Sequence, residues 1–171
     1  VTVSPLPTIN AGPDVSVCAG NTITLTATSN SSFSWNNGIT NNVSFIPTTT
    51  TNYIATANNN GCIKTDTVLV TVSPLPTINA GADVSVCAGN SITLNATSNS
   101  SFSWNNGITN NVSFIPTTTT SYIATATNNG CFKTDTVLVT VSPSPTINAG
   151  ADVSVCIGNS VTLIATSNTS V

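Results

Sequence analysis

The sequence has very few ionisable side chains. Its 171 residues include no Glu, Arg or His, and the only charged residues are five Asp and two Lys. General acid–base catalysis relies mainly on His, Glu, Asp and Lys, and a Ser or Cys nucleophile needs a base within hydrogen-bond reach. No such pairing of a nucleophile with a base is visible in this sequence. The composition therefore predicts a protein that is not an enzyme and binds no cofactor.

The charge balance also argues against several partners. With two Lys and a net charge of −3, the chain has too little positive charge to neutralise phosphates, which excludes nucleic acid and anionic membrane surfaces. The aliphatic runs are far shorter than the ~20 residues of a membrane-spanning helix, so we expect no membrane contact by this segment. The acidic residues are too few and too separated for a calcium site, and no cysteine spacing is typical of zinc.

What the chain does contain is a repeat of 69 residues. Cys18, Cys87 and Cys156 are 69 positions apart, and so are Cys62 and Cys131. We expect residues 1–4 to end a preceding repeat, copy 1 to span 5–73, copy 2 to span 74–142, and 143–171 to be the first part of copy 3. Near-identical copies that touch only their neighbours suit a spacer within a longer array better than a catalyst.

Each copy is predicted to fold as an all-β domain. Apolar residues alternate with Thr and Ser over residues 22–28, which predicts one strand with a buried and a hydroxyl-rich face. Asn37-Gly38 and Asn60-Gly61 are typical of tight turns between strands. About seven short strands per copy favour an antiparallel β-sandwich. Two prolines within three residues at each joint, as at Pro74 and Pro76, predict restricted linkers and an extended rod of sandwiches.

Four aromatic residues are expected in the cores. Trp35 and Tyr53 of copy 1 lie on predicted strands, and Trp104 and Tyr122 are their counterparts in copy 2. Large aromatic side chains dominate core energetics, so we interpret them as packing residues rather than ligand-binding ones.

Four segments of copy 1 resemble the PKD-like and immunoglobulin-like repeats of giant bacterial surface proteins. They are Asn10 to Asp14, Gly20 to Leu25, Phe33 to Trp35, and Thr65 to Val72. The segments VCAGN and NNGC are most similar to repeats of Bacteroidota adhesins, including gliding-motility adhesins exported by the type IX system. The acidic Gly-Asp-Gly turn of PKD domains is missing, and Asn36-Asn37-Gly38 stands in its place. The resemblance implies tandem immunoglobulin-like sandwiches at the cell surface.

The five cysteines indicate disulfides, because an extracellular location favours oxidation. In an immunoglobulin-like sandwich, Cys18 at the end of the first strand and Cys62 at the start of the last lie at opposite poles. These poles are on the order of 20 to 30 Å apart, whereas a disulfide allows ~4.4 to 6.8 Å between Cα atoms. This favours an inter-repeat bond between Cys18 and Cys131, leaving Cys62, Cys87 and Cys156 for repeats outside this sequence. The intra-repeat Cys18–Cys62 pairing stays open.

These features predict a structural stalk, a segment of a large extracellular adhesin or surface filament that spaces a distal module from the cell. Its partners are then neighbouring repeats of the same chain, and the low charge also allows lateral assembly of identical chains. The alternative is a repeated low-affinity module that binds glycans or surfaces through Asn- and Thr-rich loops. Within Asp-Thr-aliphatic segments, Thr67 and Thr136 resemble Bacteroidota O-glycosylation sites.

Overall fold

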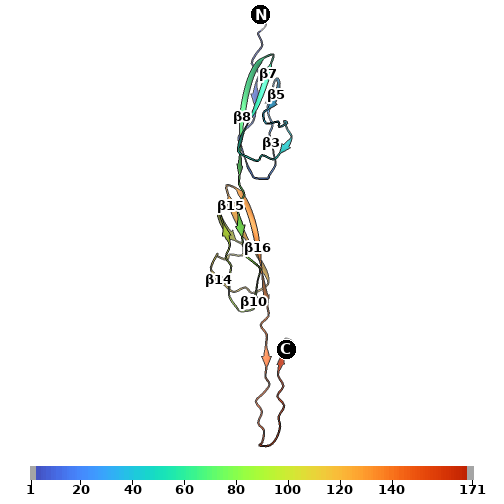
Figure 1. The fold of residues 1–171 in the computed structure, drawn as a ribbon, viewed down its shortest axis with the longest axis vertical. Coiled ribbons are helices and arrows are strands. Elements are labelled where there is room, and N and C mark those ends of the chain that lie inside the picture. The colour runs from blue at the N-terminus through green and yellow to red at the C-terminus, as the bar shows by residue number, and fades with distance from the viewer. Residues whose placement is uncertain (1–2, 169–171) are drawn as a thin grey trace. The chain divides into compact units, whose positions relative to one another are not determined.

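The computed structural model describes residues 3–168, and the fold is all-β with tandem immunoglobulin-like sandwiches (Figure 1). By compactness the chain divides into two units. The first contains residues 1–79, 97–103 and 125–134, and the second contains 80–96, 104–124 and 135–171. The first unit therefore includes copy 1 together with one end of copy 2. Among residues 3–168, no helix is long and apolar enough to cross a membrane.

Copy 1 is built from eight strand segments in two layers. The segments are β1 (Ile9–Asn10), β2 (Val15–Cys18), β3 (Ile23–Thr24), β4 (Thr28–Ser29), β5 (Ser32–Trp35), β6 (Ser44–Phe45), β7 (Thr51–Asn59) and β8 (Cys62–Ser73). One layer contains the short pairs β1–β4 and β3–β6, and the other is a four-stranded sheet in the order β2-β8-β7-β5. The chain thus leaves one layer after β1 and joins the other at β2, where it pairs in parallel with β8.

The long hairpin of β7 and β8 forms the centre of the larger sheet (Figure 1). Its turn uses Asn60 (φ 49°) and Gly61 (φ 88°), the left-handed geometry that the Asn-Gly pair predicted. The hairpin's inward side chains include Tyr53, Val68 and Val70. They pack with Trp35 of β5 and with Leu25 and Ala27 from the segment between β3 and β4. The core therefore depends on residues from both halves of the copy.

The strand predicted over residues 22–28 is broken, which corrects the sequence-based expectation. Only β3 and β4 are strands, and residues 25–27 between them are not. In this segment the backbone groups form hydrogen bonds with the loop that contains Asn41 and Asn42, instead of with a neighbouring strand. The Asn41 amide accepts from the Ala27 N–H at 2.7 Å and donates to the Ala27 carbonyl at 3.2 Å, while the Asn42 N–H donates to the Leu25 carbonyl at 3.1 Å. The predicted inward faces are correct, because Leu25 and Ala27 are each 4% exposed.

Copy 2 repeats this architecture. Its segments are β9 (Ile78–Asn79), β10 (Val84–Cys87), β11 (Ile92–Thr93), β12 (Thr97–Ser98), β13 (Ser101–Trp104), β14 (Ser113–Phe114), β15 (Thr120–Asn128) and β16 (Cys131–Ser142). The larger sheet has the order β10-β16-β15-β13, again with a parallel β10–β16 pair. In copy 3 the described strands are β17 (Ile147–Asn148) and β18 (Thr166–Ser167), which pair with each other.

Candidate functional site: the disulfide joint

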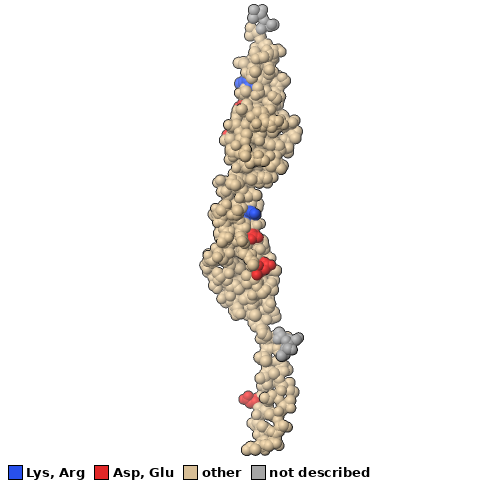
Figure 2. All heavy atoms as spheres, in the orientation of Figure 1, with Lys and Arg blue, Asp and Glu red and all other residues tan. Residues whose placement is uncertain are grey.

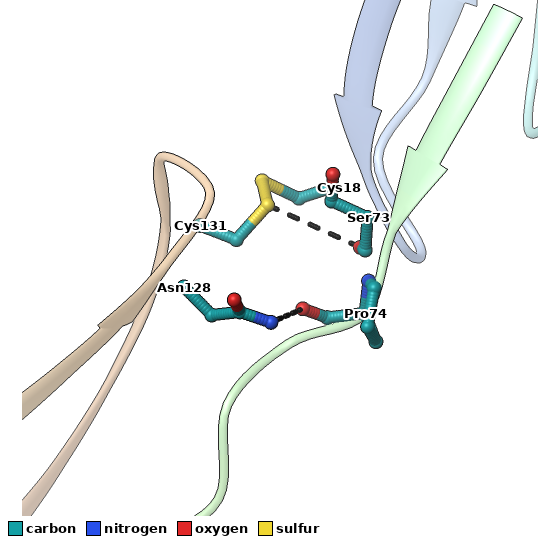
Figure 3. Close-up of a disulfide and its surroundings, with 5 residues drawn as sticks. All are labelled: Cys18, Ser73, Pro74, Asn128 and Cys131. Atoms are coloured by element: carbon teal, nitrogen blue, oxygen red, sulfur yellow. Dashed lines mark hydrogen bonds between the residues drawn. A yellow bond between two sulfur atoms is a disulfide. The ribbon is translucent and has the colours of Figure 1, made fainter. Parts of the chain in front are cut away.

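The first compact unit contains a disulfide between copy 1 and copy 2. Cys18 and Cys131 are bonded with a Cα–Cα distance of 5.6 Å, across a sequence separation of 113 residues (Figure 3). Cys18 ends β2 and Cys131 begins β16, as the sequence analysis expected of these two positions. The structure thus has the inter-repeat pairing and not the Cys18–Cys62 alternative.

Ser73, the last residue of β8, joins the two sides of this site. It lies opposite Cys18 in the parallel β2–β8 register, and its carbonyl accepts the Ala19 N–H at 2.9 Å. The Cys131 Sγ lies 4.0 Å from the same carbonyl oxygen (Figure 3). This is a contact rather than a hydrogen bond, because a disulfide sulfur carries no proton. Ser73 is only 8% exposed, so the joint excludes water from the end of β8.

The linker that follows β8 is also fastened to the hairpin of copy 2. The Asn128 side chain donates from Nδ2 to the Pro74 carbonyl at 3.4 Å, as Figure 3 shows. Pro76 is buried, and Cys131 is 2% exposed. A hollow of about 210 Å³ remains beside the bond, lined by residues that include Ser16, Cys18 and Asn129. Cys131 lines the same hollow, so the hollow lies against both halves of the bond.

The other three cysteines are free in the part of the chain that the structure describes. Cys62 is half-buried, and its Sγ lies 3.5 Å from the Ser4 carbonyl oxygen. Cys87 and Cys156 are exposed. Their expected bonds to other repeats stay a prediction.

The four aromatic residues expected in the cores are 7–8% exposed. The indole Nε1 of Trp35 donates to the Asn41 side chain, and that of Trp104 donates to the Asn110 side chain.

The carboxylates of Asp14 and Asp66 hold the segment between β1 and β2, where the chain passes from one layer to the other. Asp66 on β8 accepts the Ala11 N–H at 2.8 Å, and Asp14, just before β2, accepts the Leu69 N–H of β8 at 2.8 Å. Asp135 and Asp83 make the equivalent bonds in copy 2. The chain between β1 and β2 is therefore held to β8 from both sides, which sets the position of Cys18.

Hydrogen bonding sets the protonation of Asp66. The bond from the Ala11 amide, followed by the bond from the Thr67 amide, holds the pKa of Asp66 below its ordinary value, and Lys64 adds a smaller effect in the same direction. Desolvation of the carboxylate raises its pKa and so opposes these effects. The bond from Ala11 holds the segment before β2 to β8, which is a structural role for Asp66.

Sequence reasoning missed the parts played by Asp14, Asp66, Asn41, Asn128 and Ser73. No usable signal marked them, because copies 1 and 2 differ at only six positions and almost every residue recurs.

Among residues 3–168, no group of three or more His, Cys, Asp or Glu side chains is placed to hold a metal ion. On the face shown in Figure 2, the charged side chains are few and scattered over uncharged surface.

Comparisons with known proteins found structural likeness only. No family model matches the chain. No curated protein matches it either. Among solved structures it is similar to "Sidekick-1 immunoglobulin domains 1-5" (15% identity, TM-score 0.46), covering 85% of this chain and 41% of that one. It is also similar to "Drosophila OTK, extracellular domains 3-5" (13%, 0.46), covering 79% and 62%. A third similar structure is the insect immune protein hemolin, with 17% identity and a TM-score of 0.46, covering 80% of this chain and 47% of that one. The chain thus spans less than two thirds of each of these structures.

Proposed function

We propose that this chain is a stalk segment of an extracellular surface fibre, in which repeated sandwiches space a distal module from the cell. The observation that carries the proposal is the Cys18–Cys131 bond, which links copy 1 covalently to copy 2 in addition to the Pro74-containing linker. A disulfide persists in oxidising compartments, which supports an extracellular location. The sequence resemblance to Bacteroidota adhesins of gliding motility and type IX secretion supports a cell-surface origin.

The covalent topology has a direct mechanical consequence. Tension applied to the two ends of the chain passes through the bond, so the residues between Cys18 and Cys131 carry no load while it is intact. At about 3.5 Å per extended residue, the bypassed segment corresponds to roughly 400 Å of contour length. A spacer under force gains from such a bypass because its length stays nearly constant. The paired prolines at each joint, such as Pro74 and Pro76, favour an extended rod for the same purpose.

The loops that a binding module would use are largely occupied by internal contacts. Asn36 accepts from the Ile54 N–H and donates to the Asn52 carbonyl. Asn41 binds Ala27 and Trp35, and Asn58 accepts from the Gly61 N–H. Amide groups that hold the fold together are less available to a ligand. This supports the stalk over a binding function for these loops.

A second candidate function, repeated weak binding, is favoured by one observation. Copies 1 and 2 carry equivalent shallow hollows of about 260 Å³ each. The hollow in copy 1 is lined by Thr8, Ile9, Asn10, Thr28, Ser29 and Asn30. Repetition of a polar hollow would allow avidity. However, Asn30 already accepts the Thr8 N–H and Ser29 donates to the Thr8 carbonyl, which leaves few free polar groups.

Single-molecule pulling on the oxidised chain tests the stalk. We expect the first full extension to lack roughly 400 Å of the contour length, and adding a reductant to release it in one step. Cys18→Ser should give the full length from the start. A glycan array probed with the same chain tests the competing function, and saturable binding that strengthens with the number of copies would contradict the spacer.

Two further features are part of the proposal. Thr67 and Thr136 are exposed on β8 and β16, so a modifying enzyme can reach their hydroxyls. Mass spectrometry of the protein from its native source, with Thr67→Ala as the control, tests O-glycosylation.

Exposed aliphatic side chains such as Val43 and Ile46, each 54% exposed, support lateral assembly of identical chains on a weakly charged surface. Light scattering at increasing concentration tests that association.

A further inference from the structure

The two cysteines of the joint differ in exposure, although both line one hollow. Cys18 is half-buried, whereas Cys131 is 2% exposed. The hollow of about 210 Å³ reaches both of them. It is smaller than the roughly 300 to 1,000 Å³ of pockets that hold drug-sized molecules, so it suits a thiol of about the size of free cysteine. Because Cys18 is the more exposed of the two, a small thiolate that enters from solvent meets the Cys18 sulfur first.

The lining of this hollow carries no charge. Besides the two cysteines it consists of Ser16, Val17, Ser73, Asn129 and Gly130. Such a lining neither attracts nor repels the charge of a reagent at short range. The rate of thiol–disulfide exchange in the hollow then depends on the pKa of the attacking thiol and hardly on the charge of the rest of the reagent.

A site equivalent to the copy 2 side of the joint is formed in copy 1 around a free cysteine. The Asn59 side chain donates from Nδ2 to the Pro5 carbonyl at 3.0 Å, and the Cys62 Sγ lies 3.5 Å from the Ser4 carbonyl oxygen. The joint has the same two contacts between the residues 69 positions later in the sequence (Figure 3). These contacts therefore do not depend on a disulfide.

The copy 1 side of the joint is also held without the bond. Cys18 lies opposite Ser73 in the parallel β2–β8 register, and the Ala19 N–H donates to the Ser73 carbonyl at 2.9 Å. The next residue, Pro74, is the one to which Asn128 donates. Hydrogen bonds thus fasten both the end of β2 and the hairpin of copy 2 to the dipeptide Ser73-Pro74.

We propose that the Cys18–Cys131 disulfide is a reversible lock, opened by small thiols at Cys18, on a joint that stays docked after the bond is cut. In an oxidising medium the joint is covalent. After reduction the same contacts hold the two copies together at rest but yield to force, because only hydrogen bonds of about 1 kcal/mol each remain. The inference rests on the observed joint and not on the stalk function.

The lock opens in two exchange steps. A reagent thiolate attacks the Cys18 sulfur, forms a mixed disulfide with it and releases Cys131 as a thiolate, which takes a proton from solvent. A second reagent thiolate attacks the reagent sulfur of the mixed disulfide and releases the Cys18 thiolate, which is protonated in turn. Two reagent thiols are oxidised to one small disulfide, and the protein disulfide is reduced to two thiols.

Peptide mapping tests the route of entry in the full chain carrying Cys62→Ser, Cys87→Ser and Cys156→Ser, which removes the other thiols. Brief treatment with free cysteine, followed by acid quenching, should leave the added cysteine on Cys18 and the Cys131 thiol free. Mercaptoethanol, cysteamine and thioglycolate should react within about threefold of one another once each rate is corrected for the pKa of the reagent. An adduct on Cys131, or rates ordered by reagent charge, would overturn the proposal.

Alkylation of the buried thiol tests whether the joint stays docked. In the Cys18→Ser variant, Cys131 should react with iodoacetamide at least about tenfold more slowly than Cys62 of the same molecule, because the docked joint covers it. Each rate is first divided by its value in urea, which removes intrinsic differences between the thiols. Unchanged Trp fluorescence checks that the copies are folded. Equal corrected rates would show that the joint opens without the bond, against the proposal.

A matched pair of variants tests the hydrogen bond from Asn128. In a glutathione redox buffer, Asn128→Ala should favour the reduced form about tenfold, equivalent to about 1.4 kcal/mol, because losing the bond lowers the effective concentration of the two thiols. Asn59→Ala removes the equivalent bond to Pro5 and should leave this equilibrium unchanged. Equal shifts in both variants, or no shift in Asn128→Ala, would contradict the docked joint. Glycan binding would contradict the stalk without affecting these results.

Discussion

The same stretch of sequence has two different environments in copy 1 and copy 3. Leu25 of copy 1 is 4% exposed, whereas its counterpart Leu163 is 73% exposed. The pair β1–β4 has its equivalent in β17–β18, but residues 153–156 form no strand where copy 1 has β2. Among residues 143–168, the structure describes only the pair β17–β18. In copy 1, Leu25 packs with Tyr53, Val68 and Val70 of the β7–β8 hairpin. The β1–β4 type of pairing thus forms from local sequence, while burial of Leu25 depends on contacts with the hairpin.

The largest effect is expected from the bond between copies 1 and 2. Replacing Cys18 and Cys131 together with Ser should lower the free energy of unfolding by about 4 to 5 kcal/mol, the chain-entropy value for closing a loop of this length. Urea denaturation of the oxidised protein measures the loss. Cys62→Ser is the control, because Cys62 is free and its removal should change the midpoint little. Equal effects of the two variants would show that the bond contributes no stability.

The second prediction tests the copies directly. Leu25→Ala removes a buried side chain and should cost about 2 to 5 kcal/mol, whereas Leu163→Ala, at an exposed position, should cost less than about 0.5 kcal/mol. Urea denaturation followed by Trp fluorescence gives the value for Leu25, and hydrogen exchange of the amides of residues 143–168 gives the value for Leu163, because the two Trp residues lie in copies 1 and 2. A comparable loss in the Leu163 variant would mean that copy 3 is packed in solution, and the comparison would fail.

The third prediction concerns the loop that binds residues 25–27. Asn41→Ala leaves the Ala27 N–H and carbonyl and the Trp35 indole N–H without their partner and should cost about 1 to 3 kcal/mol. Thermal unfolding checks the value, and hydrogen exchange at the Ala27 amide should accelerate. Asn52→Ser is the matched control, because copy 2 already has Ser at this position, Ser121. Unchanged exchange at Ala27 would contradict the role assigned to Asn41.

The smallest effect is expected for the change of the melting temperature as the pH is lowered. Because the pKa of Asp66 is lower in the folded state, its contribution is present above the ordinary aspartate pKa of about 3.9 and is lost as pH falls through the folded pKa. Asp66→Asn should therefore lower the melting temperature at neutral pH and differ less from the parent protein below about pH 4. Melting curves across this range measure the difference. A difference that stays constant with pH would exclude the carboxylate as the cause.

Much of the joint was predictable once the strands had been assigned. The positions of Cys18 and Cys62 at opposite ends of their strands argued for Cys131 as the partner of Cys18, and the structure has that bond. The contributions of Ser73 and Asn128 were not predictable. They depend on which carbonyl faces which side chain across the linker, and the sequence pattern contains no information about that.

The sequence by itself determined which side chains face inward and where the chain turns. Alternation of apolar and hydroxyl residues placed Leu25 and Ala27 in the core, and the Asn-Gly pairs marked the left-handed turns, because both effects act within a few residues. Only the tertiary structure decided where the strand over residues 22–28 breaks and where the carboxylates of Asp14 and Asp66 bind. Those choices depend on backbone groups brought close by folding from positions 14 to 55 residues away in the sequence.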